Sequence, residues 1–134
     1  MSTLEPRIVV TSTDMERLRT LIDTTAGDKA DALDAELLRA EVVEPTQVPP
    51  DVVTMNSRVV YRDEDTGETR EVTLCYPQDA SLEQGRVSVL APVGAALLGL
   101  SVGQEIDWQL PGGKTKRLRI MSVNYQPQAA GHYH

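Results

Sequence analysis

The chain has 134 residues, enough for one domain or for one small domain with an appendage. Its hydrophobic content of 40% can fill a core, which must be mainly aliphatic because there is no Phe. The net charge of −7 argues against a nucleic-acid binder that neutralises phosphates, and it suits a partner protein with a basic surface. A single cysteine excludes an intramolecular disulfide and a thiolate metal cluster.

The acidic charge is concentrated toward the N-terminus. Residues 1–50 hold ten acidic and five basic side chains, whereas residues 51–134 hold ten and eight. No apolar run approaches the roughly 20 residues that a membrane helix needs, and no signal peptide opens the chain. We therefore expect a cytoplasmic protein with no membrane partner.

Residues 1–44 predict a short, antiparallel, coiled-coil-like helical hairpin. After an extended lead-in at residues 7–10, Thr13 and Glu16 have the spacing of a capping box with Thr13 as N-cap. Apolar residues at three- and four-residue spacing then predict a helix over residues 14–23 and a second over 28–43. The hairpin either folds onto the rest of the chain as core or projects toward a partner.

Residues 45–50 are rich in proline and predict a linker, followed by a C-terminal domain over residues 51–134. Alternating apolar residues and turn signals predict an α+β domain with a curved antiparallel sheet. The expected strands are residues 51–54, 58–62, 70–77, a strand beginning at residue 87, 104–110 and 116–125. The final residues, 126–134, should be loosely held.

One short helix over residues 93–98 should cover the open face of the sheet. Pro92 suits a first helical turn, and Gly99 is a plausible stop. The helix is apolar nearly all round, so we expect it to be buried. Pro111, Gly112 and Gly113 mark a tight turn between the last two strands.

Three separated blocks of sequence carry a family resemblance. They are DVVTMNSRV at 51–59, APVGAALLGL at 91–100, and YQP with AAG within 125–131. With the strand, Pro-led helix and PGG turn of residues 87–113, these blocks resemble the C-terminal domain of the Gre transcript-cleavage factor family. The whole chain resembles more closely the branch of that family that regulates nucleoside diphosphate kinase.

The resemblance implies an FKBP-like C-terminal domain that docks on the coiled coil at the rim of the RNA polymerase secondary channel. The family's docking motif is an acidic or amide residue followed by Ser-Pro. Here these positions are Leu90, Ala91 and Pro92, so only the proline is kept. Leu90 is either a buried interface anchor or part of the strand's own core.

The fold analogy with prolyl isomerases does not predict that activity. Such a site needs an aromatic-lined apolar pocket, and this chain has no Phe, one Trp and four Tyr.

In the cleaving members of the Gre family, acidic residues at the tip of a long helical hairpin help to hold a second Mg²⁺. The acidic residues near the expected tip here are Asp23, Asp28 and Asp31. Carboxylates are ligands that Mg²⁺ prefers, but they are also common at helix starts because of the helix dipole. Since the first helix should have only about three turns, intrinsic transcript cleavage is not expected.

The resemblance therefore implies a non-enzymatic regulator that binds bacterial RNA polymerase near the secondary channel. It would compete with Gre factors without cleaving the transcript, and it would need no cofactor or metal. The alternative is regulation of nucleoside diphosphate kinase level or activity, and so of nucleotide pools, by direct contact or through transcription. Strong direct nucleic-acid binding is not expected.

Three smaller features have competing interpretations. Cys75 is predicted to be a small core side chain rather than a reactive thiol. The basic cluster either keeps a strand edge from pairing or forms a patch for an acidic partner. A metal pair formed by His132 and His134 is not expected in a loose tail. The basic cluster comprises Lys114, Lys116, Arg117 and Arg119.

Overall fold

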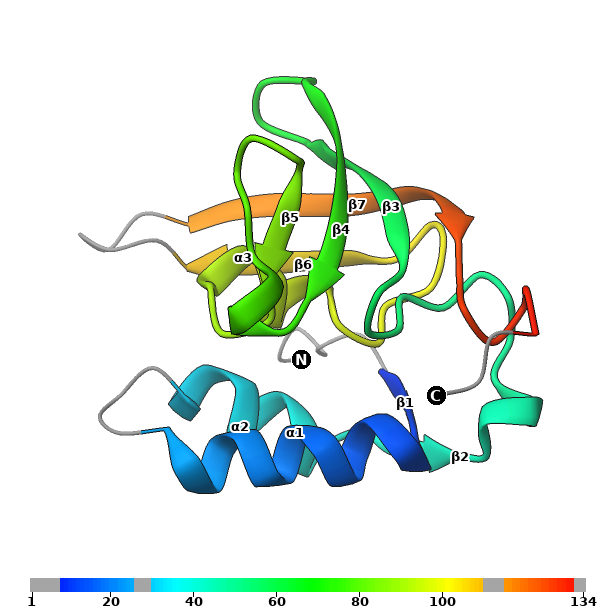
Figure 1. Cartoon of the computed structure of the whole chain (residues 1–134). Helices are drawn as coiled ribbons and strands as arrows, with labels where there is room; N and C mark the ends of the chain where they lie inside the picture. The colour runs from blue at the N-terminus through cyan, green and yellow to red at the C-terminus, as the bar shows by residue number, and fades with distance from the viewer. Residues whose placement is uncertain (1–7, 26–29, 110–114, 132–134) are drawn as a thin grey trace, which may run out of the picture.

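The computed structural model describes residues 8–25, 30–109 and 115–131, which form the predicted α+β fold (Figure 1). The helices are α1 (Ser12–Thr24), α2 (Asp31–Leu38) and α3 (Pro92–Leu97), with short 3-10 helices η2 (Pro45–Gln47) and η3 (Pro77–Asp79). The strands are β1 (Val9–Thr11), β2 (Glu41–Val43), β3 (Arg58–Asp63), β4 (Thr69–Cys75), β5 (Arg86–Ser88), β6 (Glu105–Gln109) and β7 (Thr115–Tyr125). None of the described helices is long and apolar enough to cross a membrane.

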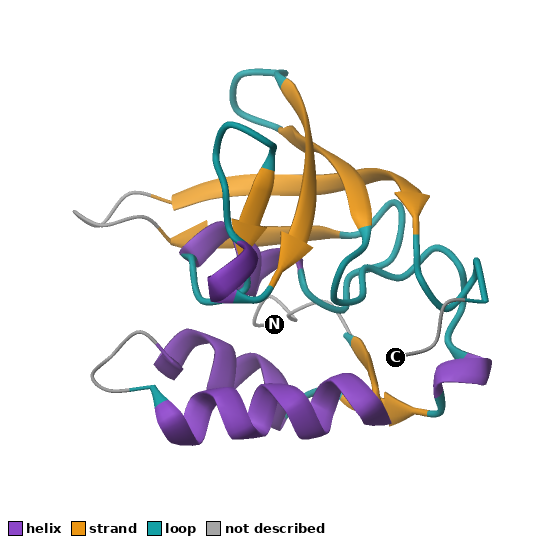
Figure 2. Cartoon of the chain, in the orientation of Figure 1, coloured by secondary structure: helices purple, strands orange, loops and turns teal. Residues whose placement is uncertain are grey.

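The main sheet has five strands in the order β5-β4-β3-β7-β6 (Figure 2). The predicted hairpin of β3 and β4 is confirmed, and β7 pairs antiparallel with both β3 and β6. The tight turn predicted at residues 111–113 lies outside the described residues. The expected resemblance of this domain's fold to that of FKBP-type prolyl isomerases stays a prediction.

The sheet is mixed, because β5 runs parallel to β4, with Thr73 opposite Arg86 and Cys75 opposite Ser88. The prediction of a wholly antiparallel sheet is therefore wrong at this pair. A two-residue period identifies a strand but not its direction. The chain leaves β4 and returns through η3 and a loop, so β5 re-enters the sheet in the direction of β4.

The last strand, β7, is irregular where it pairs with β3. Its pairing with β3 shifts register twice, which is the mark of β-bulges and adds local twist. Leu118 and Ile120 are buried in the core, and Val123 packs against it. The bulges thus let one 11-residue strand keep its apolar face inward along its length.

The short helix α3 is the predicted buried plug. Ala91 is its N-cap in an extended conformation, and Pro92 occupies the first turn. Ala95, Ala96 and Leu97 are buried against the sheet. The helix ends at Leu97 with Leu98 as its C-cap, and Gly99 follows with a φ of +81°, an unstrained conformation for glycine.

The first helix begins earlier than the sequence predicts. Its N-cap is Thr11, whose Oγ1 accepts a hydrogen bond from the backbone N–H of Asp14 at 3.1 Å. The assignment of Thr13 as N-cap is therefore wrong by two residues. The chain offers hydroxyls at Thr11, Ser12 and Thr13, and pairing of β1 with β2 fixes Thr11 in the extended conformation that a cap requires.

The second helix is shorter than the predicted span of 28–43. It ends at Leu38, and Glu41–Val43 forms β2, parallel to β1. The N–H of Glu41 donates to the carbonyl of Ile8 at 2.9 Å. Because the partner strand lies some thirty residues away, the helical pattern of residues 28–43 cannot reveal this pairing.

The two N-terminal helices pack onto the sheet domain through their apolar faces. Leu18 of α1 and Leu33 and Leu37 of α2 belong to the same buried cluster as Leu74 and Leu97. Of the two alternatives for the helix pair, packing onto the core is the one observed, and α2 faces α3 (Figure 1). The predicted division of the chain into an N-terminal part ending at residue 44 and a C-terminal domain beginning at residue 51 stays a prediction.

The segment after β7 is held more firmly than predicted. Gln126 is buried, and its side-chain amide donates to the carbonyls of Pro49 and Val52 at 2.8 Å each. Gln128 accepts a hydrogen bond from the Thr54 hydroxyl at 2.8 Å. The expectation of a loose tail is thus wrong for residues 126–128, because side-chain amides there bond to Pro49 in the linker and to Val52 and Thr54 just after it.

Candidate functional site

The predicted docking edge lies between the end of β5 and the start of α3. Leu90 donates its N–H to Ser88 Oγ at 3.0 Å, and Ala91 donates to the Ser88 carbonyl at 3.0 Å. These bonds make a tight corner in which Leu90 packs partly against the core. Pro92 is exposed, and Ala91 is half-buried.

This corner presents an apolar edge on a rigid support. Part of Leu90 contacts the core and the rest is accessible, while its role as an interface anchor stays a prediction. Gly94, one turn into α3, lies so close to β5 that a Cβ there would be 2.0 Å from the Ser88 carbonyl oxygen. The corner is therefore held closely against both β5 and α3.

The predicted hairpin tip is only partly described. Asp23, next to last in α1, and Asp31, first in α2, are exposed at the same end of the helix pair. Asp28 lies outside the described residues. Arg19 and Asp34 join the two helices near this end at 2.5 Å. The described residues contain no group of three or more His, Cys, Asp and Glu side chains that could hold a metal ion.

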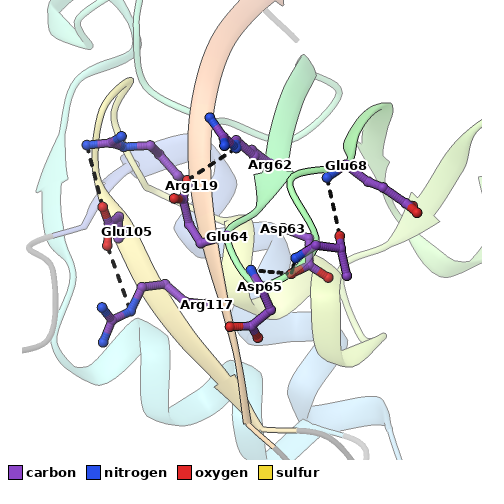
Figure 3. Close-up of polar contacts among 9 residues, drawn as sticks. Arg62, Asp63, Glu64, Asp65, Glu68, Glu105, Arg117 and Arg119 are labelled. Carbon is purple, nitrogen blue, oxygen red and sulfur yellow. Dashed lines mark hydrogen bonds and ion pairs between the residues drawn. The ribbon is translucent and has the colours of Figure 1, made fainter.

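The basic cluster is already neutralised by carboxylates of the same chain. Figure 3 shows Arg117 and Arg119 reaching Glu105, at 3.8 and 3.5 Å. Arg117 also lies 3.0 Å from Asp107. These pairs weaken the interpretation of the cluster as a free patch for an acidic partner. Lys114, like His132 and His134, lies outside the described residues.

Lys116, on the same strand β7, completes this set of ion pairs by reaching Asp63 of β3. Its Nζ lies 3.1 Å from Asp63 Oδ2, and this hydrogen bond holds the pKa of the Asp63 carboxyl below its ordinary value. Cys75 is buried as predicted, and burial raises the pKa of its thiol. A raised pKa disfavours the reactive thiolate at neutral pH.

A buried carboxylate that sequence reasoning missed connects α1 to the sheet domain. Asp14, in the first turn of α1, is 6% exposed and accepts a hydrogen bond from the N–H of Met55 at 3.2 Å. Burial raises the pKa of Asp14, although the bonds from Met55 and Thr11 oppose that rise. The only signal in the sequence was its place three residues after a Thr.

The Asp14→Asn variant is expected to remove a pH dependence of stability. Asn keeps an acceptor for Met55 but cannot ionise. Because the folded-state pKa of Asp14 lies above its unfolded value near 3.8, the wild type binds a proton more tightly when folded. Its free energy of unfolding should therefore fall, relative to Asp14→Asn, as pH rises from 3.8 and level off above the folded pKa.

Urea unfolding of both proteins between pH 3.5 and 7.5 checks this expectation. A wild type that gains stability relative to Asp14→Asn over that rise in pH would contradict it.

Sequence comparison places the chain in a known family. Residues 48–125 match the model of "Transcription elongation factor, GreA/GreB, C-term", and residues 6–43 match "Rnk N-terminus". The "Regulator of nucleoside diphosphate kinase" of Escherichia coli strain K12 is 48% identical over 131 residues, which is 96% of each chain. GreA of Thermodesulfovibrio yellowstonii is 34% identical over 94 residues, which is 70% of this chain and 59% of that protein.

The structural comparison agrees with the sequence. The solved structure of a prokaryotic transcription elongation factor GreA/GreB from Nitrosomonas europaea superposes with a TM-score of 0.73 at 50% identity. The match covers 90% of this chain and all of that one. By its C-terminal domain the chain belongs to the GreA/GreB family of transcription elongation factors, and over its full length to the regulators of nucleoside diphosphate kinase within that family.

Proposed function

We propose that the chain is a non-enzymatic transcription regulator that binds bacterial RNA polymerase near the secondary channel and competes with Gre factors. The observation that carries this proposal is the match of residues 48–125 to the elongation factor family, joined to a helix pair much reduced in length. With 13 and 8 residues, α1 and α2 extend only about 20 and 12 Å.

The packing of the helix pair supports binding without transcript cleavage. Cleavage in the resembling factors needs carboxylates carried deep into the channel. Here the apolar faces of both helices are buried on the sheet domain, which keeps Asp23 and Asp31 close to it. The acidic end would then stay at the channel mouth, where it suits basic protein and is repelled by RNA.

The docking edge is proposed to be Leu90, Ala91 and Pro92. An exposed proline beside a half-buried leucine can fill an apolar pocket on a partner, and the rigid corner keeps the ordering cost small. The missing acidic-Ser pair of the family motif means that apolar contact must supply more of the affinity here.

A competition experiment with Pro92→Glu tests this edge. Glutamate is favourable in a first helical turn, so α3 should persist while the apolar contact is lost. We expect at least about a tenfold loss of affinity for core RNA polymerase, which is about 1.4 kcal/mol. The measurement is displacement of labelled GreA from the polymerase by increasing amounts of the chain.

Met121→Glu is the matched control. Met121 is an exposed apolar residue on β7, 40% accessible, away from the corner. It should bind like the wild type. If the wild type fails to displace GreA at micromolar concentrations, or if both variants bind as well as it does, the proposed docking is wrong.

A second candidate function is direct regulation of nucleoside diphosphate kinase. It is favoured by the name of the Escherichia coli relative, "Regulator of nucleoside diphosphate kinase", which is 48% identical over nearly the whole chain. The two hypotheses separate in a mixture of the purified chain and kinase without polymerase. A change in kinase activity there would support direct contact, whereas no change would leave an effect through transcription.

A further inference from the structure

Two arginines flank a threonine on the outer face of the main sheet. Register places Arg58 of β3 opposite Thr73 of β4, and Thr73 opposite Arg86 of β5. The neighbouring Val72 and Leu74 are buried, so Thr73 and its two partners face outward. We name Arg58, Thr73 and Arg86 the arginine row.

The two arginines of the row, like Arg17 and Arg70, form no ion pair with a carboxylate among the described residues. Most described Lys and Arg side chains have a carboxylate partner, which holds for Arg19, Arg39, Arg62, Lys116, Arg117 and Arg119. In a chain of net charge −7, the row brings two arginines together beside one carboxylate, that of Glu71.

One hydrogen-bond donor of the Arg86 side chain also has no partner. One of its terminal nitrogens donates to Gln84 Oε1, but its Nε is buried and has no hydrogen-bond partner. A buried donor without a partner costs free energy. Because this Nε is covered, an anion at the row would accept from the terminal guanidinium nitrogens.

The row lines a surface hollow of about 350 Å³, together with Glu71, Val72, Gln84 and Gly85. Adjacent strands lie about 4.8 Å apart, so the backbones of Arg58 and Arg86 are separated by roughly 10 Å. Two arginine side chains can converge from that distance on one small anion above Thr73. Guanidinium forks bind phosphate in bidentate fashion, and the Thr73 hydroxyl adds a central donor.

We infer that the arginine row binds a single phosphate group, free or as the terminal group of a small phosphorylated molecule. Glu71 limits the size of the ligand, because its carboxylate lines the same hollow, where Asn124 Nδ2 donates to it at 2.7 Å. An extended polyanion such as nucleic acid would lie across that carboxylate and be repelled. A compact phosphate between the arginines avoids it.

The test is a titration of the full chain with sodium phosphate at constant ionic strength, followed by amide chemical shifts in NMR. We expect saturable shifts centred on Thr73 and Arg86, with a dissociation constant on the order of 1 mM or tighter. A parallel titration with ADP distinguishes the sources. Tighter binding and extra shifts with ADP indicate a nucleotide phosphate, and equal binding indicates free phosphate.

Arg58→Gln should weaken phosphate binding at least about fivefold, since one fork is lost. Arg70→Gln is the matched control. Arg70 lies on β4 and loses the same charge, but its register partner is Tyr61 and it does not line the hollow. Equal weakening by both variants would show non-specific charge attraction and overturn the inference. So would an absence of saturable shifts, or shifts centred elsewhere.

Discussion

Replacing Gly94 with alanine is expected to destabilise the chain by about 3 kcal/mol or more. A Cβ at this position would lie 2.0 Å from the Ser88 carbonyl oxygen and 3.1 Å from Val89 Cα. Both are backbone atoms, so relief requires α3 and β5 to separate. In an unconstrained helix the same change would stabilise by about 1 kcal/mol. A loss of stability would therefore indicate the close approach of α3 to β5.

Urea unfolding of Gly94→Ala beside Pro92→Ala measures this effect. Pro92 belongs to the same helix but is exposed, so its replacement should change the free energy of unfolding by less than about 1 kcal/mol. A Gly94→Ala protein as stable as the wild type would mean that α3 does not approach β5 so closely. The rigid corner that supports Leu90 would then lose its physical basis.

The elements that sequence reasoning predicted well are those fixed by local chemistry. Pro92 and Gly99 bound α3 because one suits a first helical turn and the other tolerates a positive φ. The hairpin of β3 and β4 follows from alternation on both sides of a polar turn. Each of these signals lies within a few residues of its effect.

The errors share a dependence on distant partners. Glu41–Val43 continues a helical pattern, but pairing with β1 makes it a strand. Thr11 rather than Thr13 caps α1 because β1 ends there. The direction of β5 and the anchoring of Gln126 likewise depend on segments far along the chain.

The candidate sites divide in the same way. The proposed docking edge was placed from the family's docking motif, which falls on consecutive residues between a strand and a Pro-led helix, and it stays a prediction. Arg58, Thr73 and Arg86 are separated by 15 and 13 positions, and only the register of three strands brings them together. Asp14 is similar, since its burial depends on contact with Met55.

Gly99→Ala is expected to cost more than an ordinary glycine replacement in a left-handed conformation, because β1 rests on this residue. The N–H of Val9 donates to the Gly99 carbonyl at 3.1 Å, and Gly99 donates to Val53 at 2.9 Å. A Cβ here would lie 2.7 Å from Ile8 Cβ. We expect conformational strain of about 1 kcal/mol plus about 1–3 kcal/mol from this overlap.

Gly103→Ala separates these two costs. Gly103 has a φ of +90°, but nothing lies within 4 Å of its added Cβ, so it should show the conformational strain alone. The difference in unfolding free energy between the two variants then reports how tightly β1 is held against the turn after α3. If the two variants are equally destabilised, Ile8 and β1 can move away from the added Cβ with little loss of stability. The attachment of the helix pair would then rest on the buried Leu18, Leu33 and Leu37 rather than on the contact at Gly99.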